Sequence, residues 1–468
     1  PEETGLVIAA ELCVDLCAPH NNKKKNAQAG SNVIVNLSAI DEVTGKSDYR
    51  RSLVEGQSAR LLCGYIYASA GEGESTQDLV YGGHSLIAEN GHILAQSPRF
   101  ESGIIYAEFD ISRLRAERRR MTTFPAAKDA SGYGTRGLVS ASDDVAAGEA
   151  DRGRRCEEML MIQSLGLKKR MLHTGAKSIV VGISGGLDST LALLVMTKAC
   201  DLLGMPRDTM TAVTMPGFGT TDRTYHNACS LTKSLGAKLL EVDIRDAVKI
   251  HFRDIGQNPE VHDVTYENSQ ARERTQILMD LANKTGGLVI GTGDMSELAL
   301  GWATYNGDHM SMYGVNAAVP KTLVRHLVRY YADTCGDTVV GEILYDVLDT
   351  PVSPELLPPQ NGEIAQKTED IVGPYELHDF FLYYMLRFGY PPAKIYRVAK
   401  LAFAGAYDER VILKWLKTFY RRFFSQQFKR SCIPDGPKVG SVALSPRGDL
   451  RMPSDACARL WMDELERL

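Results

Sequence analysis

The sequence predicts an α/β fold in which a Rossmann-like parallel sheet carries helices on both faces over the C-terminal part of the chain. From about residue 156 onward, apolar runs of strand length alternate with longer helical segments. Parallel strands need a crossover connection, usually a helix, so this alternation favours a parallel sheet that is covered on both faces. The stretch VVGISGGLDSTLALLV, residues 180–195, adds a glycine-rich turn between one predicted strand and the next helix.

The N-terminal part has a different pattern. The first 110 residues or so are predicted to form short strands and turns, because Gly and Asn interrupt the apolar or alternating runs TGLVIAAELC, NVIVNLSAI, LLCGYIYASAG and HSLIAENGHIL. The basic stretch RLRAERRR, residues 113–120, is predicted to be the solvated face of a helix. Residues 122–153 lack apolar periodicity and are rich in Gly, Ala, Ser, Asp and Arg. We therefore expect a domain over 1–112, a linker over 113–153 and a larger domain over 154–468.

The predicted elements of the larger domain follow one another in a regular order. The expected strands are 178–184, 208–217, 237–244 and 287–294. The expected helices are 157–173, 189–204, 224–236 and 269–286. This order places SGGLDS at the carboxyl end of the first strand, which is the edge of a parallel sheet where ligands bind.

Composition and charge exclude several classes of function. The 468 residues include 53 Lys and Arg against 58 Asp and Glu, and a net charge of −5 argues against a nucleic-acid scaffold. The nine cysteines have no paired spacing, which favours reduced thiols over a disulfide framework or a zinc site. No apolar run approaches the roughly 20 residues of a membrane span. We expect a cytoplasmic protein whose partners include neither nucleic acid nor membrane.

The turn SGGLDS is suited to bind a polyphosphate. Gly185 and Gly186 allow the backbone to turn sharply and to point several N–H groups at one place, toward which the following helix directs its positive end. Ser184 and Ser189 add hydroxyl donors. Asp188 would repel phosphate unless a cation lies between them, so we expect Mg²⁺ there. The alternative is a tight turn with Asp188 as a helix-start carboxylate. The loop is not a Walker A motif, because no lysine follows its glycines.

The full SGGxDS pattern after an apolar strand resembles the pyrophosphate loop of the ATP pyrophosphatases, which split ATP between its α and β phosphates. Five longer segments narrow the resemblance: TMPGFGTTDRTYHNA, GLVIGTGDMSELALGWATYNGDHMSMYGVNAAVPKT, SPELLPP, AQKTEDIVGPYELHDFFLYY and FKRSCIPDGPKVGSVALSPRGD. Together they resemble the glutamine-dependent NAD⁺ synthetases over nearly the whole chain. The resemblance implies a partial nitrilase-like α/β sandwich followed by a PP-loop synthetase domain.

Members of that family use ATP to activate nicotinic acid adenine dinucleotide as an NAD-adenylate with release of pyrophosphate, and ammonia then displaces AMP to give NAD⁺. The resemblance assigns ATP binding to Ser184, Gly185, Gly186, Asp188, Ser189 and Thr292, Mg²⁺ binding to Asp188 and Glu297, and catalytic roles to Asp188 and Lys321. Asp294, on the same loop as Thr292, would face the same crevice. Lys321 would meet phosphate charge, because cations must offset the repulsion between a carboxylate and a polyphosphate.

The resemblance assigns the substrate dinucleotide to Trp302, Lys429 and Asp449. Trp302 would stack on the nicotinoyl ring, although a core tryptophan is an alternative from the sequence alone. Lys429 has the alternative of a surface lysine.

Two further groups of polar residues invite a ligand or catalytic role. Arg272 and Arg274 have i, i+2 spacing, so at most one should reach a ligand and the other should form a salt bridge. The segment YELHDFF contains Glu376, His378 and Asp379, for which we expect helix packing and capping rather than catalysis.

The segment AAELCVDLCAP resembles the nucleophile segment of the nitrilase-like glutaminases, with Cys13 as the nucleophile. The resemblance implies that Cys13 attacks the glutamine amide, forms a thioester and releases ammonia into a tunnel. A reactive thiolate needs a base and a cation nearby, which the family supplies from upstream segments. Only twelve residues precede Cys13 in the sequence. Glu2, Glu3 and Glu11 are unsuitable as the base, and no lysine motif that could supply the cation precedes Cys13. A buried, inert thiol is the alternative.

Three other positions also depart from the family pattern. Val14 stands where the family has an acidic residue, Cys17 where it has a tryptophan, and Ile40 where it commonly has a small hydroxyl residue. Cys13 and Cys17 without other ligands do not predict a metal site. Two explanations stay open, a piece of a longer enzyme or a natural short form that uses free ammonia, and the abrupt start favours the first.

Two other functions remain alternatives at this stage. One is another PP-loop amide ligase of the GMP synthetase type, and the other is a nucleotide-binding module without turnover. The GWATYNGD and SPRGD segments argue against the first, and the joint presence of Asp188, Glu297 and Lys321 argues against the second. The family resemblance also implies a homo-oligomer.

Overall fold

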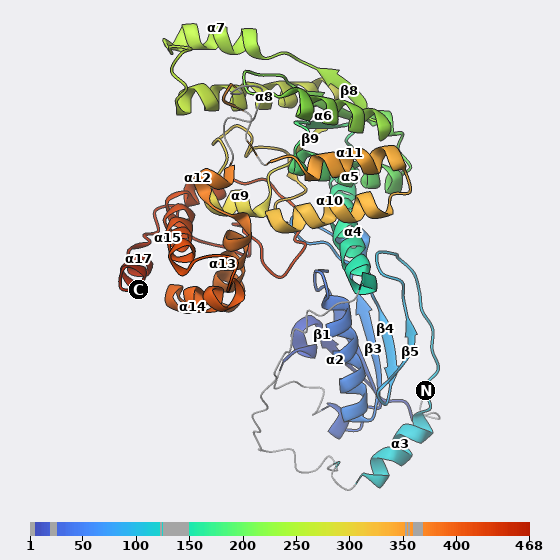
Figure 1. Ribbon diagram of the computed structural model, residues 1–468. Coiled ribbons are helices and arrows are strands. Elements are labelled where there is room, and N and C mark those ends of the chain that lie inside the picture. The colour runs from blue at the N-terminus through green and yellow to red at the C-terminus, as the bar shows by residue number, and fades with distance from the viewer. Residues whose placement is uncertain are drawn as a thin grey trace. The chain divides into compact units, whose positions relative to one another are not determined.

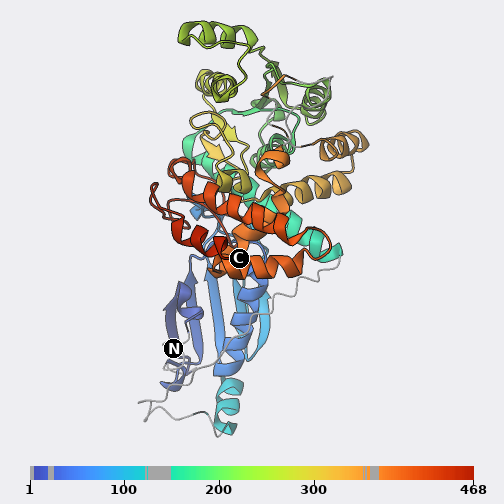
Figure 2. The same ribbon diagram turned by 60° about the vertical axis from the view of Figure 1, so that its left-hand side comes forward.

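The computed structural model of the protein describes residues 5–18, 26–121, 124, 149–351, 353, 356–358 and 368–468. The chain divides into two compact units, residues 1–155 and 156–468, and each is considered by itself (Figures 1 and 2). Glu2, Glu3 and most of the predicted linker 113–153 lie outside the described residues. Within the described part of the chain, no helix has both the length and the apolar character that a membrane crossing requires.

The first unit contains a five-stranded sheet. Its strands are β1 (Ile8–Leu12), β2 (Val33–Ser38), β3 (Gly64–Ser69), β4 (Leu86–Glu89) and β5 (His92–Gln96), in the spatial order β1-β2-β3-β4-β5. The pairs β1–β2 and β2–β3 are parallel, whereas β3–β4 and β4–β5 are antiparallel. Each apolar run noted above contains a strand. The run HSLIAENGHIL contains two, because Asn90 and Gly91 both have positive φ, as a tight hairpin turn requires.

A helix in this unit was not expected from the sequence. Helix α2 (Lys46–Leu61) packs against β3, β4 and β5. Its buried side includes Ser47, Arg50 and Ser58, so the segment lacks the apolar stripe by which an amphipathic helix is recognised. Arg50 is stabilised inside the unit by an ion pair of 2.6 Å between its Nη2 and Glu42 Oε2, both side chains being buried.

The basic stretch 113–120 is helical, as expected, and lies in α3 (Ile111–Arg120). The expectation of a wholly solvated face is wrong for Arg118, which is half-buried. Its guanidinium donates to the carbonyl oxygens of Leu61 at 3.0 Å and Leu62 at 2.9 Å. These carbonyls lie at the C-terminal end of α2, where they have no partner within the helix, so Arg118 satisfies them and ties α3 to α2.

The second unit is built on a five-stranded parallel sheet. Its strands are β6 (Ile179–Gly182), β7 (Met210–Thr214), β8 (Lys238–Glu241), β9 (Leu288–Gly291) and β10 (Tyr313–Gly314), in the order β10-β9-β6-β7-β8. The intervening helices are α5 (Leu187–Leu203), α6 (Asp222–Ser234), α7 (Arg245–Ile255) and α8 (Val264–Thr285). The strand order reverses between β6 and β9. Such a switch point opens a crevice at the carboxyl ends of the two strands.

Ten further helices lie before, between and after these strands in the described part of the chain. They are α4 (Glu149–Thr174), α9 (Met295–Leu300), α10 (Lys321–Thr334), α11 (Thr338–Leu348), α12 (Thr368–Val372), α13 (Tyr375–Phe388), α14 (Pro392–Ala402), α15 (Glu409–Ser425) and α16 (Gln427–Arg430), and α17 (Arg459–Glu466) follows near the end of the chain. Helices α13 to α15 share an aromatic core that includes Phe381, Phe419 and Phe423. His378 packs in this core and donates from Nε2 to the carbonyl of Val372 at 2.7 Å, which confirms its expected packing role.

Gly185 should be irreplaceable in the β6–α5 turn. Its φ is +83°, and a Cβ atom there would lie 2.0 Å from the carbonyl oxygen of Thr224. Gly204, at the other end of α5, also has a positive φ of 64°, but a Cβ atom there would meet nothing within 4 Å. We expect Gly204→Ala to cost only about 1–2 kcal/mol of backbone strain. Gly185→Ala should reduce the free energy of unfolding by clearly more, measured by urea denaturation. Equal losses would show that the contact with Thr224 does not constrain the turn.

Candidate active site

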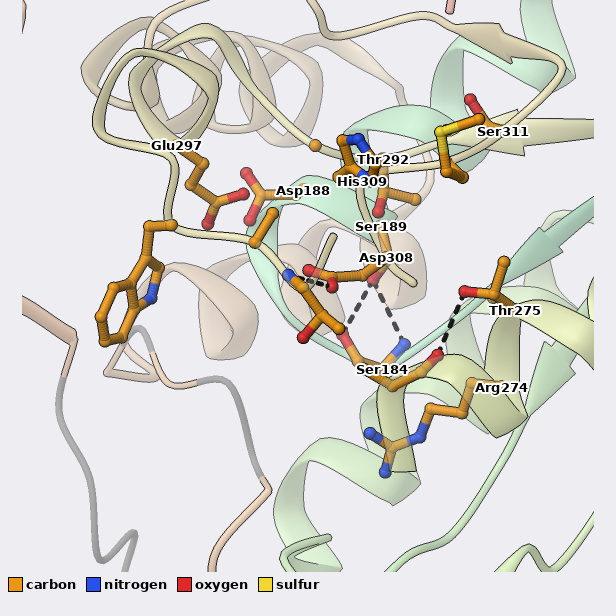
Figure 3. A pocket seen from close by; sticks show the side chains of 18 of the residues that line it. Ser184, Asp188, Ser189, Arg274, Thr275, Thr292, Glu297, Asp308, His309 and Ser311 are labelled. Carbon is orange, nitrogen blue, oxygen red and sulfur yellow. Dashed lines mark hydrogen bonds between the residues drawn. The ribbon is translucent and has the colours of Figure 1, made fainter. Parts of the chain in front are cut away.

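The crevice between β6 and β9 holds a cavity of about 430 Å³. Ser184, Asp188 and Ser189 line it from the β6–α5 turn, and Thr292 and Glu297 line it from the segment after β9 (Figure 3). The two segments are more than a hundred residues apart in the sequence. The sheet therefore brings together the two halves of the site that the sequence predicted separately.

The β6–α5 turn presents hydrogen-bond donors to this cavity. The Ser184 and Ser189 hydroxyl oxygens lie 3.2 Å apart, and the Gly186 N–H donates to Ser184 Oγ at 3.2 Å. Helix α5 begins directly after the turn, so the positive end of its dipole adds to these donors. An anion in the cavity would meet the hydroxyl groups of Ser184 and Ser189 close to the N-terminus of α5.

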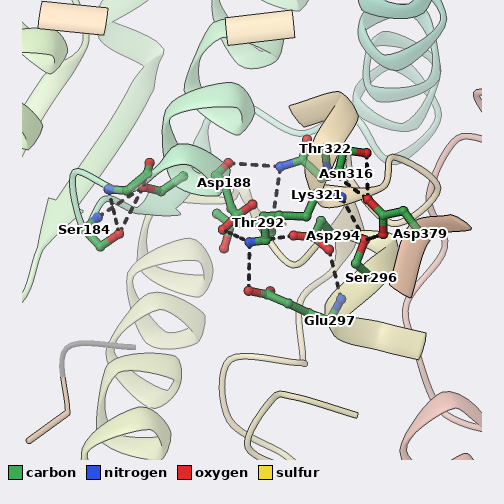
Figure 4. A network of polar contacts seen from close by, with 12 residues as sticks. Ser184, Asp188, Thr292, Asp294, Ser296, Glu297, Asn316, Lys321, Thr322 and Asp379 are labelled. Atoms are coloured by element: carbon green, nitrogen blue, oxygen red, sulfur yellow. Dashed lines mark hydrogen bonds and ion pairs between the residues drawn. The ribbon is translucent and has the colours of Figure 1, made fainter. Parts of the chain in front are cut away.

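An ion-pair cluster forms the floor of the crevice (Figure 4). Lys321 Nζ lies 2.6 Å from Asp188 Oδ2, 2.6 Å from Asp294 Oδ2 and 2.9 Å from Glu297 Oε1. Lys321 is only 4% exposed and Asp294 is fully buried, while Asp188 and Glu297 border the cavity. In this structure the ammonium of Lys321 contacts the three carboxylates rather than the cavity, so its contact with phosphate stays a prediction.

The cluster holds more carboxylate than one ammonium can neutralise. Burial raises the pKa of Asp294 well above its usual range, and burial with the nearby Asp188 raises the pKa of Glu297 to about 7, although Lys321 opposes both shifts. Burial lowers the pKa of Lys321, but the surrounding carboxylates raise it by more, and it lies well above its usual range. An added cation would therefore be stabilised beside these carboxylates.

The carboxylates meet the donor requirements of Mg²⁺. One oxygen each from Asp188, Asp294 and Glu297 lies within 4.8 Å of the others, and Mg²⁺ prefers such hard oxygen ligands. Asp188 Oδ1 has no hydrogen-bond partner within the described residues. Asp188 and Glu297 border the cavity, whereas Asp294 is buried behind them, so the first two are the pair that a ligand in the cavity can approach.

Asn316 joins the two halves of the site and was not singled out from the sequence. Its Nδ2 donates to the carbonyl oxygens of Asp188 at 2.9 Å and Thr292 at 3.0 Å. Gln163 of α4 in turn donates to Asn316 Oδ1 at 3.1 Å. The sequence carried a weak signal, because Asn316 lies in the same family-like segment as Lys321, VNAAVPKT. Its side-chain amide fixes the distance between the β6–α5 turn and the β9–α9 segment.

Asp379 orients Lys321 from behind. Its Oδ2 accepts hydrogen bonds from the backbone N–H of Thr322 at 3.0 Å and from the Thr322 hydroxyl at 2.7 Å, and its Oδ1 accepts one from Ser296. These bonds satisfy orphan donors at the first turn of α10, so the expected capping role of Asp379 is confirmed. Glu376 accepts a hydrogen bond from the Tyr407 hydroxyl, also a structural contact.

Trp302 and Lys429 lie together at one end of the cavity. Both line it. Lys429 Nζ donates to the carbonyl oxygens of Gly301 at 2.8 Å and Ala303 at 2.6 Å, which flank Trp302. The Arg422 guanidinium carbon lies 5.3 Å from the centre of the Trp302 ring. Lys429 is therefore no ordinary surface lysine, because it holds the segment that presents the indole.

Asp449 and the two arginines of α8 are placed differently. Asp449 is not among the side chains that line the cavity and forms an ion pair of 2.6 Å with Lys438. Arg274 lines the cavity, whereas Arg272 does not, as their i, i+2 spacing predicts. The salt bridge expected for Arg272 is replaced by weak donation to the carbonyl of Tyr305 at 3.4 Å.

Cys13 lies in the first unit, at the end of β1, where the short helix η2 (Cys13–Leu16) begins. Its φ of +48° is unusual for a residue other than glycine, and the thiol is half-buried rather than buried. Asn36 donates from Nδ2 to the Cys13 carbonyl at 3.3 Å and to Glu11 Oε1 at 3.1 Å. A strained turn between a strand and a helix is a geometry in which nucleophiles are exposed, and the half-buried thiol fits it.

Comparison with known families matches both units. The NAD synthase family matches residues 160–398, and the carbon-nitrogen hydrolase family matches residues 3–119. The glutamine-dependent NAD(+) synthetase of Mycobacterium leprae is 42% identical over 99% of this chain and 75% of its own length. That of Aquifex aeolicus is 27% identical over 97% of this chain and 75% of its own length.

Two solved structures share the fold. The glutamine-dependent NAD(+) synthetase of Cytophaga hutchinsonii superposes with a TM-score of 0.74 at 21% identity and covers 98% of this chain and 73% of that one. The enzyme of Acinetobacter baumannii in complex with ADP superposes with a TM-score of 0.60 at 23% identity, over 96% of this chain and 72% of that one. Because the Mycobacterium leprae relative is 42% identical and is covered over 75% of its length, the chain belongs to the family of glutamine-dependent NAD(+) synthetases.

Proposed function

We propose that the cavity between β6 and β9 is where this ligase converts nicotinic acid adenine dinucleotide to NAD⁺ through an NAD-adenylate, with release of AMP and pyrophosphate. The observation that carries the proposal is that Asp188 and Glu297, both paired with the buried Lys321, line the same cavity as Ser184 and Ser189 of the SGGLDS turn. The related enzyme of Acinetobacter baumannii was solved with ADP, which supports an adenine nucleotide as one ligand.

The β6–α5 turn would bind the phosphates of ATP. Donors would come from the Ser184 and Ser189 hydroxyls and the N-terminus of α5, without a lysine in the loop. Gly185 and Gly186 would add their backbone N–H groups, of which that of Gly186 donates to Ser184 Oγ in this structure. Thr292 borders the same cavity from the β9 side. Asp188 and Glu297 would hold Mg²⁺, which when bound neutralises phosphate charge and stabilises the departing pyrophosphate.

Lys321 would fix the positions of the Asp188 and Glu297 carboxylates by contacting both of them. Its ammonium contacts both of them and the buried Asp294, so neither can turn away from the cavity without losing a charge-assisted hydrogen bond. The attacking substrate carboxylate is ionised at neutral pH, so this first step needs no general base. The site therefore positions groups and stabilises charge, and the residues near the reacting atoms abstract no proton in that step.

Trp302 would stack on the nicotinoyl ring, with Lys429 holding its segment. Asp449 enters the proposal only as a contact farther along the dinucleotide, because it does not line the cavity. Ammonia would come from glutamine through Cys13 or from free ammonia. A cytoplasmic location and a homo-oligomeric state, both inferred from the sequence, belong to the same proposal.

Asp188→Asn should abolish adenylation. We expect pyrophosphate release with ammonia, Mg²⁺ and the deamido dinucleotide to fall by roughly 10²–10³-fold, because the neutral amide no longer offers a cation an ionised oxygen. The matched control is Asp201→Asn on the same helix, where Asp201 pairs with the exposed Arg207 and lies outside the cavity. A near-normal rate in Asp188→Asn with an unchanged unfolding transition would refute the metal-binding role.

Lys429→Met should weaken dinucleotide binding more than the chemical step. Without the two hydrogen bonds to Gly301 and Ala303, the Trp302 segment loses its support, and we expect KM for the dinucleotide to rise about tenfold. Steady-state kinetics measures both constants. The control is Lys400→Met, which removes a half-buried lysine that pairs with Glu409 and does not line the cavity. A fall in kcat of about tenfold with an unchanged KM would instead place Lys429 at the reacting centre.

Cys13→Ala should leave ammonia-driven synthesis unchanged, because the cysteine lies in the other unit and the synthetase cavity contains no part of it. Any NAD⁺ formation that depends on glutamine should disappear in the same variant. Cys17→Ala, at an exposed cysteine four residues away, serves as the control. Loss of the ammonia-driven rate would mean that Cys13 has a role in the synthetase reaction that we have not assigned.

A further inference from the structure

A second cavity, of about 210 Å³, lies within the first unit. Three segments supply its walls: the first turns of α2 with Ser47 and Arg51, the residue His84 before β4, and Gln96 with Arg99 at and after the end of β5. Asp48 and Arg154 complete the lining and pair with each other at 2.9 Å. None of these residues belongs to the synthetase cavity or to the Cys13 segment.

His84 is the most unusual group in this cavity. His84 is 2% exposed, and neither of its ring nitrogens has a hydrogen-bond partner within the described residues. Buried polar groups in folded proteins are hydrogen-bonded with few exceptions, because an unpaired one has lost its hydration without compensation. A ring with two unpaired nitrogens on the wall of a cavity therefore indicates that a polar partner occupies the cavity.

The charges around the cavity select an anionic partner. Three of its lining side chains are arginines, Arg51, Arg99 and Arg154, against the single carboxylate of Asp48, which is paired with Arg154. Burial and, after it, the positive charges of Arg50, Arg99 and Arg51 together lower the pKa of His84 to about 4, while Asp48 opposes them. Arg51 also pairs with Glu55 at 3.2 Å, so three guanidinium groups lie beside two carboxylates. With a neutral imidazole, the groups around the cavity still carry one net positive charge, which an anion would offset.

The donors of the cavity are held in place before any ligand binds. Arg99 Nη1 donates to Ser47 Oγ at 3.2 Å, and Arg51 Nη1 donates to Gln96 Oε1 at 2.6 Å. The Ser85 N–H donates to Ser97 Oγ at 2.8 Å, which fixes the backbone beside His84 against the segment that carries Arg99. The guanidinium groups of Arg51 and Arg99 and the imidazole of His84 therefore lie on neighbouring walls, with His84 buried, Arg99 half-buried and Arg51 exposed. Such guanidinium groups suit the binding of an oxyanion.

We propose that this cavity binds a small tetrahedral oxyanion of the phosphate class. The volume of about 210 Å³ lies below the roughly 300–1,000 Å³ typical of sites for larger organic ligands, so it suits inorganic phosphate or pyrophosphate rather than a nucleotide. Arginine forks match phosphate oxygens, and a neutral imidazole can accept a hydrogen bond from a protonated phosphate oxygen or donate one to an ionised oxygen. The proposal is independent of the function proposed for the other unit.

The test follows the imidazole of His84 itself, because phosphate also enters the synthetase cavity. Long-range ¹H–¹⁵N spectra of the full chain with labelled histidine would be recorded during titration with sodium phosphate and, separately, sodium pyrophosphate. Ionic strength is held constant with sodium chloride, and His84→Gln identifies the signal. We expect a saturable shift of the His84 ring signals, and the anion that saturates at the lower concentration is the preferred ligand.

Two matched arginine variants decide the outcome. Arg99→Gln removes a guanidinium of the cavity, and we expect it to weaken the apparent affinity at His84 about tenfold or more. Arg60→Gln removes an exposed arginine at the other end of α2 and should leave the affinity unchanged. The proposal is overturned if the His84 signals do not respond to either anion, if chloride alone produces the same shift, or if both variants bind alike.

Discussion

The synthetase unit depends on one buried ammonium and the three carboxylates around it. Lys321 Nζ lies within 3 Å of an oxygen of each of Asp188, Asp294 and Glu297. Removing any of these charges from water is costly unless a partner compensates, so none of the four could occupy its position alone. The cluster is therefore a constraint on the whole crevice. It joins the start of α5, the start of α9 and the start of α10, and of its members Asp188 and Glu297 line the cavity.

Backbone contacts transmit this constraint to the walls of the cavity. Asn316 donates to carbonyls on both sides of the crevice, and Asp379 fixes the first turn of α10 on which Lys321 stands. The same arrangement recurs at the other end, where Lys429 holds the backbone on both sides of Trp302. Charged side chains thus serve largely to hold backbone and other charged groups in place. Such support leaves few groups free to rearrange when a polyphosphate and its counter-ion arrive.

Much of the fold could be predicted from the sequence because its signals are local. The parallel sheet follows from strand-length apolar runs that alternate with helices. The sharp turn after β6 follows from its glycines, and at Gly185 a side chain would clash with the backbone of Thr224. Helix α2 escaped prediction, since its buried positions include Ser47, Arg50 and Ser58. Those residues are buried only because Glu42 and neighbouring segments supply partners. A pattern of apolar residues cannot report a helix whose inner face is polar.

The sequence by itself determined the turn chemistry of SGGLDS and the list of acidic, basic and aromatic residues near it. Only the tertiary structure decided which of these residues line the cavity and which hold others in position. It placed Lys321 behind the carboxylates, added Asn316 as the link between two distant loops and left Asp449 outside the cavity. Local sequence fixes the backbone conformation of a turn within a few residues. Burial, charge pairing and cavity walls depend on segments more than a hundred residues apart, which meet only when the strand order β9-β6-β7 is formed.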